Sequence, residues 1–173
     1  DEFGDQVIPF VAATDDVRDI ERLAEAARHE LGQVDIVFAN AGTGHGTSLP
    51  PQEVTEEIYD AALGANLKGK FFTIMKLLPL MTRGGSVLIT GGITNHAHIT
   101  NTALLGIVQA GARSLARSLA CDLAPLGIRV NCICPGFIYS PAAYAGYDME
   151  EINRTFVSRI PLQRMGSGDE IAA

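Results

Sequence analysis

The sequence predicts an α/β fold, in which a parallel β-sheet is wrapped by helices. Short apolar runs alternate with helical segments along the chain, and this order is typical of parallel sheets. The runs are apolar throughout, as expected for strands that are buried on both faces. Composition agrees, because 47% of the 173 residues are hydrophobic and 19% are charged. That is enough apolar material for a folded core.

The first half of the chain contains two expected strands and two expected helices. Residues 7–12 form a short apolar run and are predicted to be a strand. A helix is expected between Asp16, a good N-cap, and Gly32, a good C-cap, because apolar residues recur there at helical spacing. Residues 35–39 are a second apolar strand, and a long helix is expected over residues 55–78.

The second half continues the same alternation. Strands are expected at residues 86–90 and 128–134, and a second long helix over residues 102–123 separates them. A short helix is predicted over residues 150–158, and another begins at Asp169.

Three successive strands end in small or turn-forming residues. These are Asn40-Ala41-Gly42, Gly91-Gly92 and Pro135-Gly136. Because parallel strands bring their carboxyl ends to one edge of the sheet, where ligands bind, the three ends predict a binding rim. Small residues there let the backbone approach a ligand closely.

Charge and cysteine content exclude several classes of function. The net charge is −7, from 13 Lys and Arg against 20 Asp and Glu, which argues against nucleic acid or an anionic membrane as the main partner. No apolar stretch reaches the roughly 18 residues of a membrane span, and the acidic start of the chain is unlike a signal peptide. Three cysteines are an odd number and two of them lie two residues apart, which argues against a disulfide framework, so a reducing cytoplasm is expected.

Several side chains receive a structural interpretation. Cys132 and Cys134 point to one side of a strand, which suits a core position, and without further ligands at suitable spacing no metal site is expected. The lysines of the first long helix are expected on a solvated face, and the tyrosines after residue 136 in the packing of a surface segment. These residues are Lys68, Lys70, Lys76, Tyr139, Tyr144 and Tyr147.

Seven segments, in order along the chain, carry recognisable motifs. They are Phe38-Ala39-Asn40-Ala41-Gly42, Asn66-Leu67-Lys68-Gly69, residues 84–90, residues 113–131, residues 134–138 with Ser140, residues 161–166 and residues 170–172. Together they resemble the short-chain dehydrogenase/reductase family over nearly the whole chain. The resemblance implies a Rossmann-like, doubly wound parallel sheet in three α/β/α layers, with NAD or NADP as the cofactor. It also implies the residues that would line the cofactor site: Asn40, Ala41, Gly42, Pro135, Gly136, Ile138 and Ser140.

The same resemblance predicts that the usual catalytic side chains are absent. The family catalyses with a serine, and with a tyrosine and a lysine four residues apart, so that these two share one helix face. Here the serine place falls on Gly92, the tyrosine place on Leu105 and the lysine place on Gln109. None of the three can donate a proton or carry a charge that shifts a neighbouring pKa. Of the four catalytic residues only the asparagine has a match, Asn66, for which bonding the backbone at a helix irregularity is an equal alternative.

Three functions are compatible with these residues. The sequence favours a catalytically inactive scaffold or partner subunit of an oxidoreductase. The first alternative is an NAD(P)-dependent oxidoreductase acting on an alcohol or ketone, with His96 or His98 as a stand-in acid. The second alternative is a nucleotide-binding sensor without turnover. Because family members commonly pair through their two long helices, a homo- or hetero-oligomer through residues 55–78 and 102–123 is expected.

Residues 1–173 are expected to form a single domain that is incomplete at both ends. The family's Gly-rich turn near its first strand has no counterpart in this sequence, and neither does its last strand. In the doubly wound strand order, the absent first strands would separate residues 7–12 from residues 35–39. We therefore expect a portion of a longer polypeptide, or a partner chain that completes the sheet.

Overall fold

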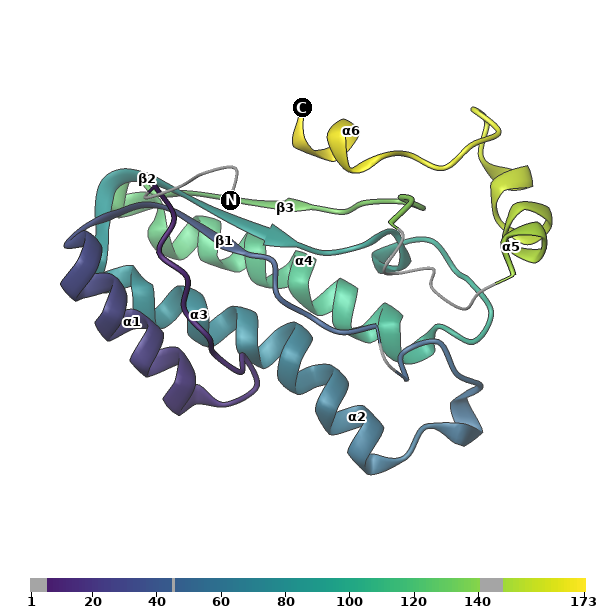
Figure 1. Cartoon of the computed structure of the whole chain (residues 1–173), viewed down its shortest axis with the longest axis horizontal. Coiled ribbons are helices and arrows are strands. Elements are labelled where there is room, and N and C mark those ends of the chain that lie inside the picture. The colour runs from purple at the N-terminus through teal and green to yellow at the C-terminus, as the bar shows by residue number, and fades with distance from the viewer. Residues whose placement is uncertain (1–5, 45, 141–147) are drawn as a thin grey trace. The chain divides into compact units, whose positions relative to one another are not determined.

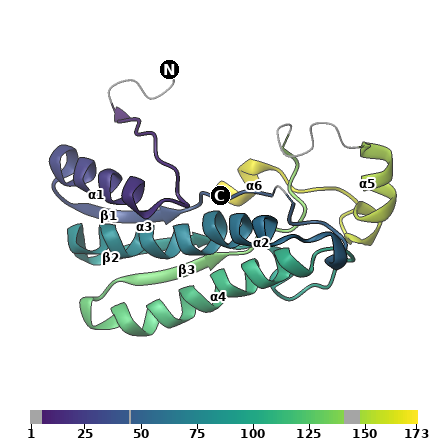
Figure 2. The same ribbon diagram turned by 90° about the horizontal axis from the view of Figure 1, so that it is seen from below.

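The chain divides into two compact units. The computed structural model describes residues 6–44, 46–140 and 148–173. The first unit is Asp1–Ile133 and the second is Cys134–Ala173. Figure 1 shows their elements along the chain, and Figure 2 shows the same elements after a quarter turn.

A parallel three-stranded sheet forms the centre of the first unit. Its strands are β1 (Val34–Ala39), β2 (Met81–Thr90) and β3 (Arg129–Ile133), in the order β1-β2-β3. The register pairs Ala39 with Ile89 and Ile89 with Cys132, so the three carboxyl ends meet at one edge. This confirms the α/β fold with a parallel sheet that the sequence predicts.

In the part of the first unit that the structure describes, three helical segments accompany the sheet. Helix α1 (Val17–Leu31) is capped by the Asp16 side chain, which accepts a hydrogen bond from the Arg18 N–H. The first predicted long helix consists of α2 (Glu56–Leu63), a π-turn (Gly64–Lys68) and α3 (Gly69–Leu77). The second is α4 (Ala103–Leu123).

The core lies between the sheet and the two long helices. Helices α3 and α4 lie side by side against one face of the sheet (Figures 1 and 2). Their apolar residues bury alternate residues of the strands, and the cluster is Val37, Ala39, Ile74, Val87, Ile89, Ala112, Ala116, Leu119, Leu123, Ile128 and Val130. The intervening residues of β1 point away from these helices, and Ile36 and Phe38 remain 67% and 52% exposed.

The strand predicted over residues 7–12 does not form. These residues are irregular coil, and Val11 is 94% exposed. A strand needs a neighbour to satisfy its backbone hydrogen bonds, and the described residues place no strand beside this segment. Pro9 also has no N–H to donate to a ladder. The apolar composition of residues 7–12 is therefore not sufficient to make them a strand.

The described residues of the second unit include two short helices. Helix α5 (Met149–Thr155) and the 3₁₀-turn after it (Val157–Arg159) match the helix predicted over residues 150–158. Helix α6 (Gly168–Ala172) begins with a capping box between Ser167 and Glu170. An ion pair with Arg164 lowers the pKa of Glu170 to about 2. In the described part of the chain, no helix is both long and apolar enough to cross a bilayer.

Candidate functional site

The carboxyl ends of the three strands are tied to one another. After β1, Asn40 accepts a hydrogen bond of 2.7 Å from the Thr90 hydroxyl at the end of β2. The N–H of Gly91 donates to the Ile133 carbonyl at the end of β3, also at 2.7 Å. The rim formed by residues 40–42 and 90–92 is thus fixed by bonds between adjacent strands. This is the edge at which the sequence places a ligand.

Asn66 fastens the loop that follows the rim. It lies in the π-turn, is 4% exposed, and its amide donates to the carbonyls of Thr43 and Ala62 at 3.0 and 2.9 Å. Its Oδ1 accepts from the Thr43 N–H at 3.0 Å. A Cβ on Gly42 would collide with this oxygen, so only glycine fits there. Asn66 thus makes the backbone bonds that one of its two predicted roles requires.

Lys70 departs from the sequence prediction. Lys68 is exposed, as expected, but Lys70 is only 4% exposed and points into the molecule. Its ammonium donates to the Thr90 carbonyl at 2.7 Å and lies 3.8 Å from where a Cβ of Gly42 would be. The solvated-face prediction is therefore wrong for Lys70.

The sequence does contain a signal for this burial. Asn66, Lys70 and Ile74 follow one another at intervals of four, which places them on one face of the helix. All three are buried in the structure. Removal from water lowers the pKa of the Lys70 ammonium, and the nearby Cys132 thiol opposes that shift only in part.

The serine and lysine places lie against each other. A Cβ on Gly92 would be 3.2 Å from Cδ of Gln109, so the Gln109 side chain borders the space that a serine would need. Oε1 of Gln109 is buried and has no hydrogen-bond partner in the part of the chain that the structure describes. Leu105 lies one turn earlier on α4 and is half-buried. The three places thus come together as a group without a titratable side chain.

Two histidines, His96 and His98, lie in the loop after β2. Both are exposed, and His96 is held by Asn95, 3.2 Å from its Nδ1. His98 lines a groove with Ala103 and Ile107 of α4. Those two residues are two positions out of phase with Leu105 and Gln109, and thus lie on the opposite side of the helix. His98 thus lies beside the face of α4 that carries Ala103 and Ile107.

The remaining predicted rim residues belong to the second unit. Ile138 forms a parallel bridge with Gly166, and the Tyr139 N–H donates to the Gly166 carbonyl at 2.8 Å. Tyr139 is half exposed, as a residue of a surface segment would be. Pro135, Gly136 and Ser140 lie in the same unit, whereas Tyr144 and Tyr147 fall outside the described residues.

The cysteines show two environments. Cys121 is exposed, and Cys132 and Cys134 are half-buried. Within residues 6–44, 46–140 and 148–173, no three His, Cys, Asp or Glu side chains are grouped as a metal ion would require.

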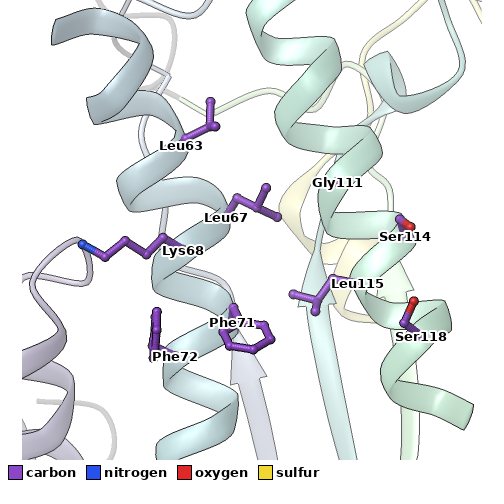
Figure 3. Close-up of a pocket in the computed structure, with 9 residues that line it drawn as sticks. All are labelled: Leu63, Leu67, Lys68, Phe71, Phe72, Gly111, Ser114, Leu115 and Ser118. Atoms are coloured by element: carbon purple, nitrogen blue, oxygen red, sulfur yellow. The ribbon is translucent and has the colours of Figure 1, made fainter. Parts of the chain in front are cut away.

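An apolar groove runs between the two long helices. It has a volume of about 530 Å³. Figure 3 shows Leu67 and Phe71 on one side pointing toward α4, and Leu115 on the other side pointing toward α3. A Cβ on Gly111 would lie 2.9 Å from Leu67, so this glycine allows α4 to approach closely. The groove is therefore an apolar surface on the same helices that the sequence predicts for association.

Comparisons with known proteins agree on one family. The family model described as enoyl-(acyl carrier protein) reductase matches residues 1–173. Oxidoreductase asL5 of Sarocladium schorii is 39% identical over 160 residues, which are 91% of this chain and 63% of that protein. A hydroxynaphthalene reductase-like protein Arp2 of Metarhizium acridum is 30% identical over 180 residues, covering 97% of this chain and 67% of the relative.

Solved structures give the same fold. A putative short-chain alcohol dehydrogenase from Sinorhizobium meliloti is 28% identical, with a TM-score of 0.86 over 94% of this chain and 64% of its own. A short-chain dehydrogenase from Burkholderia cenocepacia, in complex with NADP, is 23% identical with a TM-score of 0.83, covering 93% of this chain and 64% of its own. The chain thus spans about two thirds of the length of the proteins that it matches.

Proposed function

The chain belongs to the short-chain dehydrogenase/reductase family, and from that premise we propose that it is a catalytically inactive member that serves as a scaffold or partner subunit of an oxidoreductase. One observation carries the proposal. The serine and lysine places are adjacent in space, as catalysis requires, but Gly92 and Gln109 occupy them. Leu105 stands at the tyrosine place one turn away.

The chemistry of the family explains why these substitutions matter. Hydride transfer to a carbonyl leaves charge on oxygen, and a side chain must protonate that oxygen as the charge develops. Leucine has no proton to give, and glutamine has no charge with which to lower the pKa of a neighbouring donor. The amide of Asn66 is already engaged with the backbone at Thr43 and Ala62. The described groups therefore favour a role without turnover.

We include a nicotinamide-nucleotide cleft in the proposal. NAD or NADP, when bound, supplies a hydride donor or acceptor. Two features of the described residues support such a ligand: the rim at Asn40, which is bonded to Thr90, and, on α4, a buried Oε1 of Gln109 without a partner in the described part of the chain. An unpaired buried acceptor calls for a donor such as a ribose hydroxyl. Rim binding without turnover is also what a nucleotide sensor would need.

Association through the two long helices is the second part of the proposal. The groove between α3 and α4 is lined by apolar side chains, and Phe71 at its edge is partly exposed. Burial of such a surface against another subunit would be favourable. The odd number of cysteines also suits a cytoplasmic setting.

The test begins with the purified full-length protein. Incubated with NAD(H) or NADP(H) and a panel of alcohols and ketones, it is expected to give no turnover above background. Turnover that His96→Ala abolishes would overturn the proposal of an inactive subunit and establish the enzyme with a non-standard acid.

Association is measured by light scattering and by co-purification with an active member of the family. Phe71→Arg places a charge in the groove and is expected to abolish the complex. Leu162→Arg makes the same change at an exposed apolar residue of the second unit and serves as the matched control. If neither substitution changes the mass of the complex, the helices are not the interface.

A further inference from the structure

Lys70 presents a buried charge whose partner is not evident. Lys70 is 4% exposed, and among the described residues its ammonium makes one hydrogen bond, to the Thr90 carbonyl. No Asp or Glu of the described residues lies within ion-pair distance of it, whereas Lys76 of the same helix pairs with Glu21 at 2.6 Å. An ammonium has three N–H donors, so two remain for other acceptors.

This arrangement is unfavourable for the stability of the fold. Removing an ion from water costs free energy that a neutral backbone carbonyl repays only in part. A methionine would fill the same space without that cost. Ionisable groups that are buried and have shifted pKa values occur preferentially at functional sites.

The location of the charge indicates what it could serve. The ammonium reaches the carbonyl of the last residue of β2 and lies under the turn at Gly42. It is therefore at the carboxyl ends of β1 and β2, where the ligand of a parallel sheet binds. Because the ammonium itself is removed from water, its charge is screened less than that of an exposed lysine.

We propose that Lys70 supplies the positive charge that attracts the phosphate groups of a nucleotide to the rim at the ends of β1 and β2. The inference rests on the proposed nucleotide cleft and assigns its electrostatic component to one residue. Lys70 lies beneath the rim and acts through its charge, so its contribution to affinity depends on the charge of the ligand. It does not depend on the shape of the nucleoside.

The experiment compares an anionic and a neutral ligand of the same base. Calorimetry measures the affinities of the full-length protein for ADP and for adenosine. Two variants remove the charge: Lys70→Met keeps the length of the side chain, and Lys70→Gln keeps a donor that can approach the Thr90 carbonyl. Lys76→Met removes a charge from the exposed side of the same helix and is the control.

Both Lys70 variants are expected to weaken ADP binding about tenfold or more while leaving adenosine binding unchanged. Lys76→Met is expected to alter neither affinity. Equal losses for ADP and adenosine, or an ADP affinity retained in Lys70→Gln, would assign Lys70 a structural role and overturn the inference.

The inference and the proposed cleft can fail separately. If the wild-type protein binds ADP and the Lys70 variants bind it as tightly, the cleft stands and the role of Lys70 falls. If the wild-type protein binds neither ADP nor NADH, the cleft itself is wrong and the inference falls with it.

Discussion

Asn66 and Lys70 are two buried polar residues on one helix face, and they differ in how completely they are hydrogen-bonded. Asn66 uses both ends of its amide, on Thr43 and on Ala62. Lys70, four residues later, carries a charge with a single backbone acceptor. Because a satisfied buried group stabilises and an unpaired charge does not, the two residues should respond in opposite directions to substitution.

Asn66→Ala should destabilise the protein by about 2–4 kcal/mol, because it removes the three hydrogen bonds that the buried amide makes with Thr43 and Ala62. Urea unfolding followed by circular dichroism measures the change. Asn131→Ala, at an exposed residue of β3, should change stability by less than about 0.5 kcal/mol. Equal effects at the two sites would show that the Asn66 bonds do not hold the loop.

Lys70→Met should raise the free energy of unfolding at pH 7 by about 1 kcal/mol, because it removes a buried charge without a carboxylate partner. Burial lowers the folded-state pKa of Lys70 below its ordinary 10.5. Between those two values the unfolded state binds more protons, so wild-type stability rises with pH. The gain from the substitution should therefore be complete below the folded pKa and shrink as pH approaches 10.5.

Urea unfolding at pH 7 and at pH 10 checks both parts of the Lys70 prediction. Lys76→Met, which breaks an exposed ion pair, should show no gain at either pH. A Lys70→Met protein less stable than wild type at pH 7 would contradict the account of an unpaired charge.

At the scale of elements, the long helix shows the limits of sequence pattern. Residues 55–78 were predicted as one helix, and the structure has α2 and α3 joined by a π-turn. The chain stays helical from α2 through the π-turn into α3, so the sequence contains no stop signal at the join. The π-turn contains Asn66, whose amide donates to Thr43 in a distant loop, and no composition rule reveals such a tertiary contact.

Gly69→Ala should cost about 1–3 kcal/mol, because its Cβ would lie 2.5 Å from the Thr14 carbonyl oxygen, a backbone atom that cannot rotate away. This glycine allows the segment before α1 to cross α3. Gly64→Ala is the matched control in the same helical segment, since its Cβ would make an ordinary contact at 3.4 Å with Asp15. Thermal unfolding of both variants distinguishes close approach from helix propensity, which favours alanine at either position.

At the scale of the whole molecule, the sequence predicted the parallel sheet and the rim but not the environment of every side chain. The rim was predictable because strand direction alone brings residues 40–42 and 91–92 to one edge. The strand at residues 7–12 was not, because a strand depends on a neighbour that no local pattern specifies. The burial of Lys70 depends on how α3 is rotated against the sheet. The sequence does not show this directly, because Lys68, Lys70 and Lys76 all appear as lysines of one helix.

Restoring the family's side chains tests whether the rest of the site is intact. Gly92→Ser alone should remain inert. The serine Cβ would lie 3.2 Å from Gln109, and this variant would still have Leu105 at the tyrosine place and therefore no proton donor. Gly92→Ser with Leu105→Tyr and Gln109→Lys should give turnover with NAD(P)H about a hundredfold or more above the matched variant that carries Leu105→Phe, because phenylalanine has the same ring but no proton to transfer. Steady-state assays on ketones measure turnover, and calorimetry measures whether the same variants bind the nucleotide. A triple variant that binds nucleotide and still does not turn over would show that the cleft has diverged beyond the three catalytic positions.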